Sequence, residues 1–290
     1  GAAAFYDSVH LVSIGNGESL MKAVMLAAGV GRRLYGDQND CLPKALLRFE
    51  GKTLLERHVG ILKALGVDEL VLIVGHRKED LLAEAEKVAP GGSGGFIRSV
   101  FNPRFKEGPI VSLWTAGEEL RSGDDVLFMD SDVLYPPEMM SQLIRSVHDN
   151  CFIIDRDFQP GEEPVKLCIR DGEPVDFGKK VTDDYDDIGE WPGFLKMSGD
   201  VAAKIADAAG VYIERGECDV TYEEAMRDVL AAEPEGTFGY EDITGIPWIE
   251  IDFPSDLLCA EKIIMPLVSD FFAEETLAAE RPRIDQASGE

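Results

Sequence analysis

A short glycine-rich turn directly after an apolar strand is the feature of this sequence that most restricts its fold. Residues 22–34 read Lys-Ala-Val-Met-Leu-Ala-Ala-Gly-Val-Gly-Arg-Arg-Leu, and Leu-Pro-Lys-Ala-Leu-Leu-Arg follows at 42–48. Gly29 and Gly31 let the backbone turn tightly and approach a ligand with no Cβ in between, so that successive N–H groups can point at phosphate oxygens. Arg33 and Lys44 add positive charge. The pattern predicts a triphosphate-binding turn at the end of a strand.

Two commoner phosphate-binding motifs do not fit this segment. A dinucleotide fingerprint requires a third glycine three residues after the second, and Leu34 stands there. A P-loop requires a glycine five residues before Gly-Lys-Thr. Gly51-Lys52-Thr53 is present, but position 46 is Leu. Both motifs are therefore excluded.

Alternation of strand-like and helix-like segments predicts an α/β fold. Apolar runs of strand length occur at 23–26, 70–74, 97–101, 126–129 and 152–154. Thr53-Leu-Leu-Glu56 has the pattern of a capping box, followed by an apolar stripe that ends at Gly66, and further helices are predicted at 78–88 and 137–147. We expect a mostly parallel sheet flanked by helices.

The second half of the chain has a different pattern. Residues 165–177 predict an antiparallel hairpin with a turn at Asp171-Gly172. A capping box at 221–224, a strand at 248–253 and a helix at 255–264 are predicted after it. The glycine-rich segment 91–95 is expected to be a connection within the domain. We expect one domain over 21–268, an N-terminal extension or cloning remnant at 1–20 and a tail at 269–290.

Composition excludes several classes of protein. The 290 residues carry a formal charge of −27, which argues against nucleic acid or an anionic membrane as partner. No apolar run approaches the roughly 20 residues of a membrane helix. Five scattered cysteines without a Cys-x-x-Cys pair suggest neither a disulfide framework nor a zinc site, so we expect a cytoplasmic protein. The cluster of Arg32, Arg33, Lys44 and Arg48 is either a locally basic anion site or a solvated patch.

Two acidic segments could hold a hard cation. Asp130 and Asp132 follow the apolar strand 126–129, and the carboxyl ends of strands are where open α/β sheets bind ligands. Glu250 and Asp252 lie in the strand predicted at 248–253. Magnesium takes oxygen ligands and is commonly held by one or two carboxylates together with substrate phosphates. The alternative interpretation of Asp-x-Asp is a surface turn.

Residues 179–191 mix lysines, acids and aromatic rings. Lys179 and Lys180 precede Asp183-Asp-Tyr-Asp-Asp-Ile-Gly-Glu-Trp191. Acids with aromatic rings suit a cationic head group such as choline or aminoethyl, through opposite charge and cation–π contact. An acidic surface loop is the competing interpretation.

These motifs together resemble a known family. Leu-Ala-Ala-Gly-x-Gly-x-Arg-Leu followed by Pro-Lys-x-Leu resembles the signature of nucleotidyltransferases that activate sugar phosphates and phospho-alcohols. Further segments over residues 22–265 look like the phosphocholine cytidylyltransferase group, which includes relatives acting on aminoethylphosphonate and inositol phosphate: Asn102-Pro-Arg-Phe, Ser112-Leu-Trp, Val165-Lys-Leu, Gly189-Glu-Trp-Pro-Gly and Glu250-Ile-Asp. The resemblance implies CTP, Mg²⁺ and a glycosyltransferase-A-like, Rossmann-like fold with the added hairpin.

The resemblance also implies roles for individual residues. Arg33 would stabilise the leaving pyrophosphate, Lys44 would hold phosphate oxygens, and a hairpin lysine would meet the acceptor phosphate, with Lys166, Lys179 and Lys180 as candidates. The metal would be bound by Asp132 and Asp252, with Asp130 and Glu250 as next choices. Nucleotide contacts are expected from Leu26, Ala27, Ala28, Gly29, Gly31, Arg32, Gly108 and Ser112. Acceptor contacts are expected from Asn102, Lys180, Tyr185, Asp187, Glu190 and Trp191.

Three alternatives stay open. A sugar-1-phosphate or inositol-phosphate nucleotidyltransferase would use the same cradle with another acceptor. A glycosyltransferase could use Asp130-Ser131-Asp132, but that activity explains neither Arg33 nor Lys44. A non-catalytic nucleotide-binding paralogue belongs to a different class of protein. The expected partners are CTP and a phosphorylated or phosphonylated alcohol, and the chain could be a monomer or a homodimer.

Overall fold

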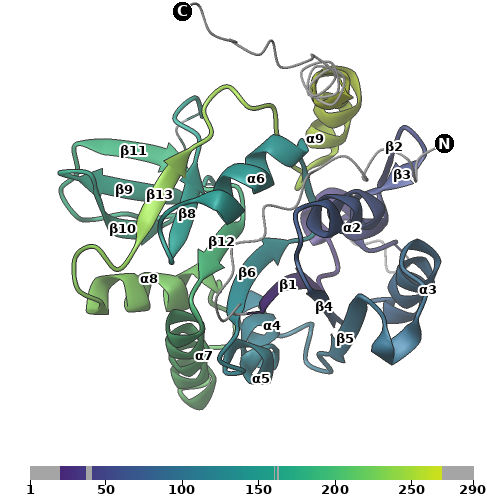
Figure 1. Ribbon diagram of the computed structural model, residues 1–290, viewed down its shortest axis with the longest axis horizontal. Helices are drawn as coiled ribbons and strands as arrows, with labels where there is room; N and C mark the ends of the chain where they lie inside the picture. Colours follow the sequence, from purple (N-terminus) through teal and green to yellow (C-terminus); the bar gives the residue numbers. More distant parts are fainter. Residues whose placement is uncertain (1–19, 37–40, 160, 162, 270–290) are drawn as a thin grey trace, which may run out of the picture.

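The computed structural model describes residues 20–36, 41–159, 161 and 163–269, and Figure 1 shows its ribbon. One large sheet crosses the molecule between two layers of helices. In the described residues it has seven strands, in the order β13 (Gly239–Asp242), β8 (Cys151–Ile154), β12 (Phe194–Met197), β6 (Asp125–Asp130), β1 (Met21–Ala27), β4 (Glu69–Val74) and β5 (Ile97–Phe101). The predicted α/β fold with a central sheet is confirmed.

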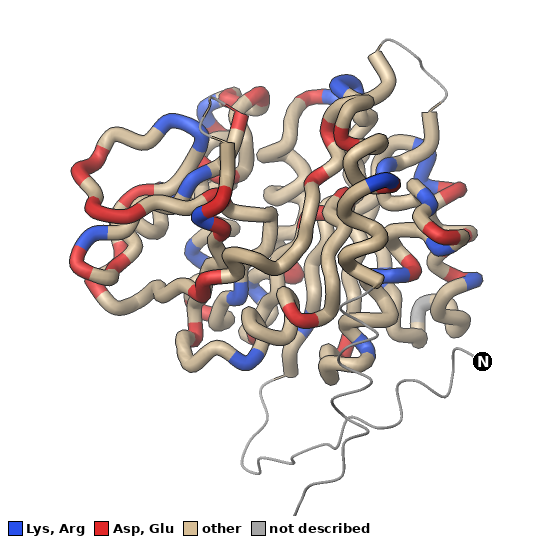
Figure 2. The backbone as a smooth tube through the Cα atoms, turned by 90° about the horizontal axis from the view of Figure 1, so that it is seen from above, with Lys and Arg blue, Asp and Glu red and all other residues tan. Residues whose placement is uncertain are grey.

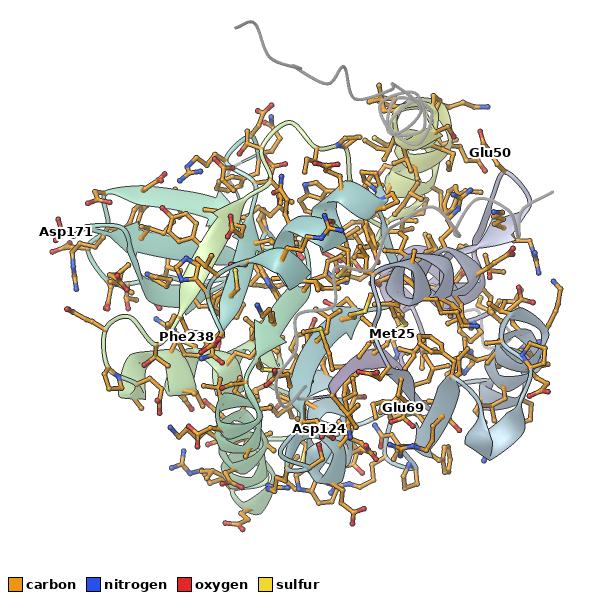
Figure 3. All side chains as sticks on the ribbon, viewed as in Figure 1. Met25, Glu50, Glu69, Asp124, Asp171 and Phe238 are labelled. Carbon is orange, nitrogen blue, oxygen red and sulfur yellow. The ribbon has the colours of Figure 1, made fainter. Side chains whose placement is uncertain are left out.

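All neighbours in this sheet run parallel except at β12, which is antiparallel to both β6 and β8. The central residues of strands β1, β4 and β6 are apolar, because both faces of the sheet are covered. Along β1, Ala23 and Met25 point to one core, and Val24 points to the other. Met25 lies deep inside the molecule in Figure 3.

The two cores correspond to two layers of helices. One face of the sheet packs on α2 (Leu54–Ala64), α3 (Lys78–Val88) and α6 (Pro137–Arg145). The other face packs on α4 (Pro109–Thr115), α5 (Gly117–Leu120), α7 (Gly199–Glu214) and α8 (Glu223–Ala232). Figure 1 shows α2 and α6 in front of the sheet.

The predicted hairpin belongs to a second, antiparallel sheet. It consists of β10 (Glu173–Gly178), β9 (Lys166–Arg170) and β11 (Asp187–Glu190) in that order. Asp171 and Gly172 form its turn with φ of 53° and 83°, the left-handed conformation that a tight hairpin needs. Asp171 lies at the outer edge of this sheet in Figure 3.

Two short ladders join distant segments. Strand β7 (Val133–Leu134), just after β6, pairs with β14 (Ile249–Glu250), and β2 (Arg48–Phe49) pairs with β3 (Lys52–Thr53). A third small core of Leu34, Phe49, Leu54, Leu134 and Ile251 fixes these ladders to the C-terminal helix. That helix begins as α9 (Pro254–Cys259) and continues through a π-helical turn, η3 (Ala260–Ile264).

Several element boundaries differ from expectation. The strand expected at 248–253 is only the two residues of β14, because it has a single short partner and Pro254 starts a helix. The helix expected at 137–147 ends at Arg145, where Ser146 turns to an extended conformation. The capping box at 221–224 is wrong. Helix α8 starts at Glu223 without a side-chain cap.

Other expected features are present. Thr53 caps α2 by accepting a hydrogen bond from the Glu56 N–H at 3.0 Å. Segment 91–95 contains a short 3-10 turn, η2 (Gly92–Gly94), and leads directly into β5. Residues 1–19 and 270–290, which contain almost all of the expected extension and tail, lie outside the described residues. Figure 2 shows acidic and basic residues spread over the outer helices and loops, as the composition predicts.

Candidate active site

The glycine turn lies at the carboxyl end of β1, where the sequence places it. Gly31 has φ of 72°, and a Cβ there would lie 3.1 Å from the ring of Tyr35, so the backbone itself requires glycine. Gly29 differs, because a Cβ at this position would meet nothing within 4 Å. Gly29 is one of the residues that line a cleft of about 360 Å³. The turn leads into the short helix α1 (Arg32–Tyr35), which carries Arg33.

Lys44 enters the same cleft from a second segment. It starts the 3-10 turn η1 (Lys44–Leu46), after Pro43 in an extended conformation. Its Nζ lies 2.9 Å from Asp132 Oδ2 and 2.6 Å from Asp252 Oδ1, and its side chain is only 13% exposed. Both carboxylates raise the pKa of Lys44 against the opposing effect of burial, so the ammonium stays charged.

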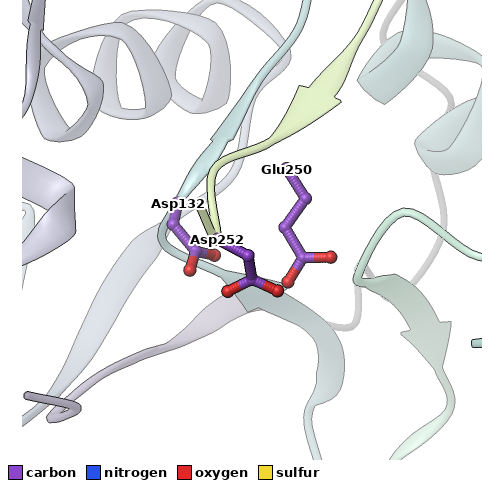
Figure 4. A group of neighbouring side chains, drawn as sticks. All are labelled: Asp132, Glu250 and Asp252. Atoms are coloured by element: carbon purple, nitrogen blue, oxygen red, sulfur yellow. The ribbon is translucent and has the colours of Figure 1, made fainter. Parts of the chain in front are cut away.

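Three carboxylates converge in the cleft that the glycine turn also lines, and Figure 4 shows their side chains. Asp132, Glu250 and Asp252 each offer an oxygen, and these oxygens all lie within 4.8 Å of one another. The β7–β14 ladder brings them together, since Glu250 pairs with Val133 and the Ile251 N–H donates to the Asp132 carbonyl at 3.0 Å. Burial and the two neighbouring acids raise the pKa of Glu250. Such a cluster favours a bound cation.

The guanidinium of Arg33 lies at the edge of this acidic cluster. Its Nη2 is 3.0 Å from Asp252 Oδ2, and its Nη1 is 3.1 Å from Glu163 Oε2. Basic anchors and acids are therefore in direct contact across the cleft. Glu163 also contacts Lys179 Nζ at 3.2 Å, so one carboxylate joins the glycine turn to the end of β10.

Asp130 lies beside the three acids without joining them. Its carboxylate accepts a hydrogen bond from the Tyr222 hydroxyl, and its pKa is raised by burial and by the charges of Asp132 and Glu250. A Cβ at Gly193, which has φ of 92°, would lie 2.6 Å from Asp130 Oδ2, so glycine there makes room for this carboxylate. Among the described residues, the third member of the acidic cluster is Glu250.

The residues expected to contact the nucleotide all line this cleft. The lining includes Leu26, Ala27, Ala28, Gly29, Gly31, Arg32, Gly108 and Ser112. Gly108 is required by packing, because a Cβ would lie 2.0 Å from the Cys218 carbonyl oxygen. Arg33, Lys44 and all four acids considered for the metal line the cleft too. Sequence reasoning missed Tyr222, which also lines it, because Thr221 and Glu224 suggested only a helix cap.

The residues expected to contact the acceptor lie elsewhere. Asn102 is fully buried and donates to Ser112 Oγ at 3.1 Å, so it supports a lining residue from behind. Asp187 is paired with Arg156 at 2.6 Å. Tyr185 and Lys180 are exposed on the small sheet and its loop. None of these four residues lines the cleft.

Trp191 is a core residue. It is 3% exposed, its Nε1–H donates to the Phe194 carbonyl at 2.7 Å, and its ring packs against Phe128, Phe152 and Phe177. The expectation that this ring meets a cationic head group is therefore corrected, because its faces are covered by other aromatic rings.

Lys166 and Glu190 come together on paired strands, outside the cleft lining. Lys166 is opposite Glu190 in the β9–β11 register, and its Nζ donates to the Gly161 carbonyl at 3.0 Å. Burial and the charge of Asp155 raise the pKa of Glu190 to about 7. Lys166, the expected catalytic lysine, thus lies near Glu190 and Asp155 and outside the cleft lining.

The chain belongs to the MobA-like NTP transferase domain family, whose model it matches over residues 23–188. It is 31% identical over 248 residues to the bifunctional IPC transferase and DIPP synthase of Rubrobacter xylanophilus, covering 84% of this chain and 52% of that protein. It is 29% identical over 248 residues to the CMP-5'-(3-aminopropyl)phosphonate synthase of Streptomyces rubellomurinus, covering 81% and 37%. The chain thus spans about half or less of these relatives.

Solved structures share the fold. The inositol-1-phosphate CTP transferase from T. maritima superposes with a TM-score of 0.66 at 21% identity, covering 88% of this chain and 97% of that one. The CTP:phosphocholine cytidylyltransferase from Streptococcus pneumoniae gives 0.65 at 24% identity, covering 84% and 99%. Within the part of the chain that the structure describes, no helix has the length and apolar character needed to cross a membrane.

Proposed function

We propose that this chain is a Mg²⁺-dependent cytidylyltransferase. It would transfer CMP from CTP to a small phosphorylated or phosphonylated alcohol and release pyrophosphate. The observation that carries the proposal is the single cleft in which Arg33 and Lys44 face Asp132, Glu250 and Asp252. Similarity to enzymes named for CTP or CMP chemistry supports cytidine as the base.

The reaction needs alignment and charge neutralisation more than proton transfer. A phosphate or phosphonate oxygen of the acceptor is ionised near neutral pH, so it can attack the α-phosphorus of CTP without a general base. The new O–P bond forms as the bond to pyrophosphate breaks, and the electron pair leaves with the pyrophosphate. Catalysis then consists of holding the two reactants in line and stabilising negative charge.

The residues of the cleft divide these tasks. Asp132, Glu250 and Asp252 offer only oxygen ligands at mutual distances within 4.8 Å, which fits a hard dication such as Mg²⁺. When bound, Mg²⁺ would neutralise charge on the nucleotide phosphates. Arg33 would bind the leaving pyrophosphate and Lys44 the phosphate oxygens. Gly29 and Gly31 would let backbone N–H groups approach the triphosphate.

Two classes of acceptor remain as candidates. An amino-alcohol phosphate or phosphonate is supported by the similarity to the CMP-5'-(3-aminopropyl)phosphonate synthase. The acids and the exposed Tyr185 that suggested a cationic head group lie outside the cleft lining, so they add little to this argument. Burial of Trp191 removes one aromatic ring from that argument. An inositol phosphate is therefore the second candidate, supported by the fold shared with the inositol-1-phosphate CTP transferase.

Pyrophosphate release tests the proposal directly. The full chain is incubated with each of four nucleoside triphosphates, with and without Mg²⁺, and with phosphocholine, aminoethylphosphonate, inositol 1-phosphate or a sugar 1-phosphate. We expect release only when CTP, Mg²⁺ and an acceptor are combined. Release with sugar 1-phosphates alone would contradict the acceptor assignment, and CTP binding without turnover on any acceptor would favour a non-catalytic paralogue.

Cellular context and chain organisation are also proposals. The five free cysteines fit the expected cytoplasmic location. The domain is proposed to span 21–268. Monomer and homodimer are both open.

A further inference from the structure

A buried histidine contacts the back of the acid-bearing turn. His58, in the middle of α2, is fully buried. Its Nε2 lies 3.2 Å from the carbonyl oxygen of Ser131, the residue between Asp130 and Asp132. Its Nδ1 lies 3.0 Å from the hydroxyl of Tyr135. Neither contact was suggested by the sequence, where His58 is one of several polar residues between the apolar positions of a predicted helix.

The two contacts define which ring nitrogen carries the proton. A backbone carbonyl can only accept, so Nε2 must be the donor to Ser131. In a neutral imidazole Nδ1 is then an acceptor, and the Tyr135 hydroxyl donates to it. The result is a series of two hydrogen bonds, in which Tyr135 donates to His58 and His58 donates to the Ser131 carbonyl. Every polar group of His58 is satisfied, as burial requires.

This bond completes the anchoring of the turn. The Asp130 N–H donates to the Gly193 carbonyl at 3.0 Å, and the Asp132 carbonyl accepts from the Ile251 N–H at 3.0 Å. The Ser131 carbonyl is held by His58. Each of three successive residues is therefore fixed by a different element. Rotation of the Ser131 peptide would redirect the following residue, Asp132, which belongs to the acidic cluster.

We propose that His58 is a positioning residue for the metal-binding turn 130–132. It fixes the Ser131 peptide so that the Asp132 carboxylate points toward Glu250 and Asp252. The inference rests on the metal site of the proposed function and adds a residue on the far side of that site. Groups that orient metal ligands from behind typically change metal affinity by 10–100-fold when removed.

Mn²⁺ binding to the full chain, measured by electron paramagnetic resonance without nucleotide, tests this role. H58F removes the donor, and its Kd for Mn²⁺ should rise at least about tenfold. Y135F is the matched control, because it removes the other hydrogen bond of the ring and leaves the bond to Ser131. Its Kd should stay within about threefold of the wild type even where its Tm falls.

A second pair of variants keeps the test decisive if H58F does not fold. The amide of H58Q extends to the Nε2 position and can donate to Ser131, whereas the shorter amide of H58N reaches only the Nδ1 side. We expect H58Q to bind Mn²⁺ like the wild type and H58N to bind at least about tenfold more weakly at a similar Tm.

The outcomes separate the two proposals. Equal Mn²⁺ affinity for H58Q and H58N, or for H58F and Y135F, would overturn the positioning role and leave His58 as a core residue. A wild-type chain that does not bind Mn²⁺ would instead contradict the metal site of the proposed function, and the positioning role with it.

Discussion

Replacement of Lys44 by methionine should destabilise the metal-free protein much more than the Mg²⁺-bound protein. Lys44 is the cation between Asp132 and Asp252, and all three side chains are 13–17% exposed. Removing this cation leaves Asp132 and Glu250 facing Asp252, which keeps Arg33 as a cationic partner at 3.0 Å. Removing one partner of a buried pair costs about 3–5 kcal/mol, and we take about 3 kcal/mol because these side chains are not fully buried.

The assay is thermal unfolding of the full chain with and without Mg²⁺. About 3 kcal/mol corresponds to a Tm roughly 6–12 °C lower for a domain of this size. Saturating Mg²⁺ should remove most of that difference, because the dication neutralises the same oxygens. K52M is the control, since Lys52 is exposed on β3 and lies outside the cleft lining. An equal Tm deficit for K44M with and without Mg²⁺ would refute the reasoning.

Further predictions concern the turn, the arginine and the buried histidine. R33A should lower kcat for pyrophosphate release on the order of 10²-fold, whereas the exposed Arg215 can be replaced by alanine without effect. G29A should leave the Tm unchanged within about 1 °C, because the added methyl group meets no atom of the described residues within 4 Å, and should weaken CTP binding, because Gly29 lines the cleft. G31A should lower the Tm, because Gly31 has a φ of 72°. Calorimetric CTP titration and thermal unfolding separate the two glycines, and equal behaviour would contradict the distinction. Burial lowers the pKa of His58 to about 4, below the ordinary value of about 6.5 in the unfolded chain. The neutral ring therefore contributes fully to the free energy of unfolding above pH 6.5. As the pH falls toward 4, the unfolded chain binds the proton more readily, and the free energy of unfolding decreases by at most about 3 kcal/mol. In urea unfolding, the free energy of unfolding of H58F should depend less on pH between 4 and 6.5 than that of the wild type. The same pH dependence in both proteins would contradict this explanation.

Local pattern was sufficient to predict that the glycine turn and its basic residues line one side of the cleft. The strand, the two glycines and the basic residues occupy one short segment, and a parallel strand delivers its loop to the ligand-binding edge of the sheet. Gly29 and Arg33 therefore lie where their sequence positions place them. The hairpin could also be predicted from local sequence, because Asp171 and Gly172 are residue types that adopt the positive φ its turn requires.

The acidic cluster could not be predicted in full, because contacts between segments that are distant in sequence bring its members together. Asp130 and Asp132 are two residues apart, so alternation along a strand would place both side chains on one face. Strand β6 ends at Asp130, however, and the chain bends before Asp132. The third acid is Glu250, which is set by pairing between two-residue strands far apart in sequence.

Trp191 illustrates the opposite difficulty. Its neighbours in sequence are polar and acidic, which suggested a binding loop. Its ring is nevertheless enclosed by Phe128, Phe152 and Phe177, which come from three other strands. Burial of a large aromatic side chain is decided by this tertiary packing, and a single aromatic residue in a polar segment carries no signal of it.

The β7–β14 ladder adds two acids to the cleft from a segment that follows all strands of the large sheet in the sequence. The last strand of the large sheet, β13, ends at Asp242, whereas Glu250 and Asp252 follow it. Every strand of the large sheet therefore precedes, in the order of synthesis, two of the three acids of the cluster. Under the proposed function, the cleft would therefore gain its complete set of metal-binding acids only when the β7–β14 ladder forms.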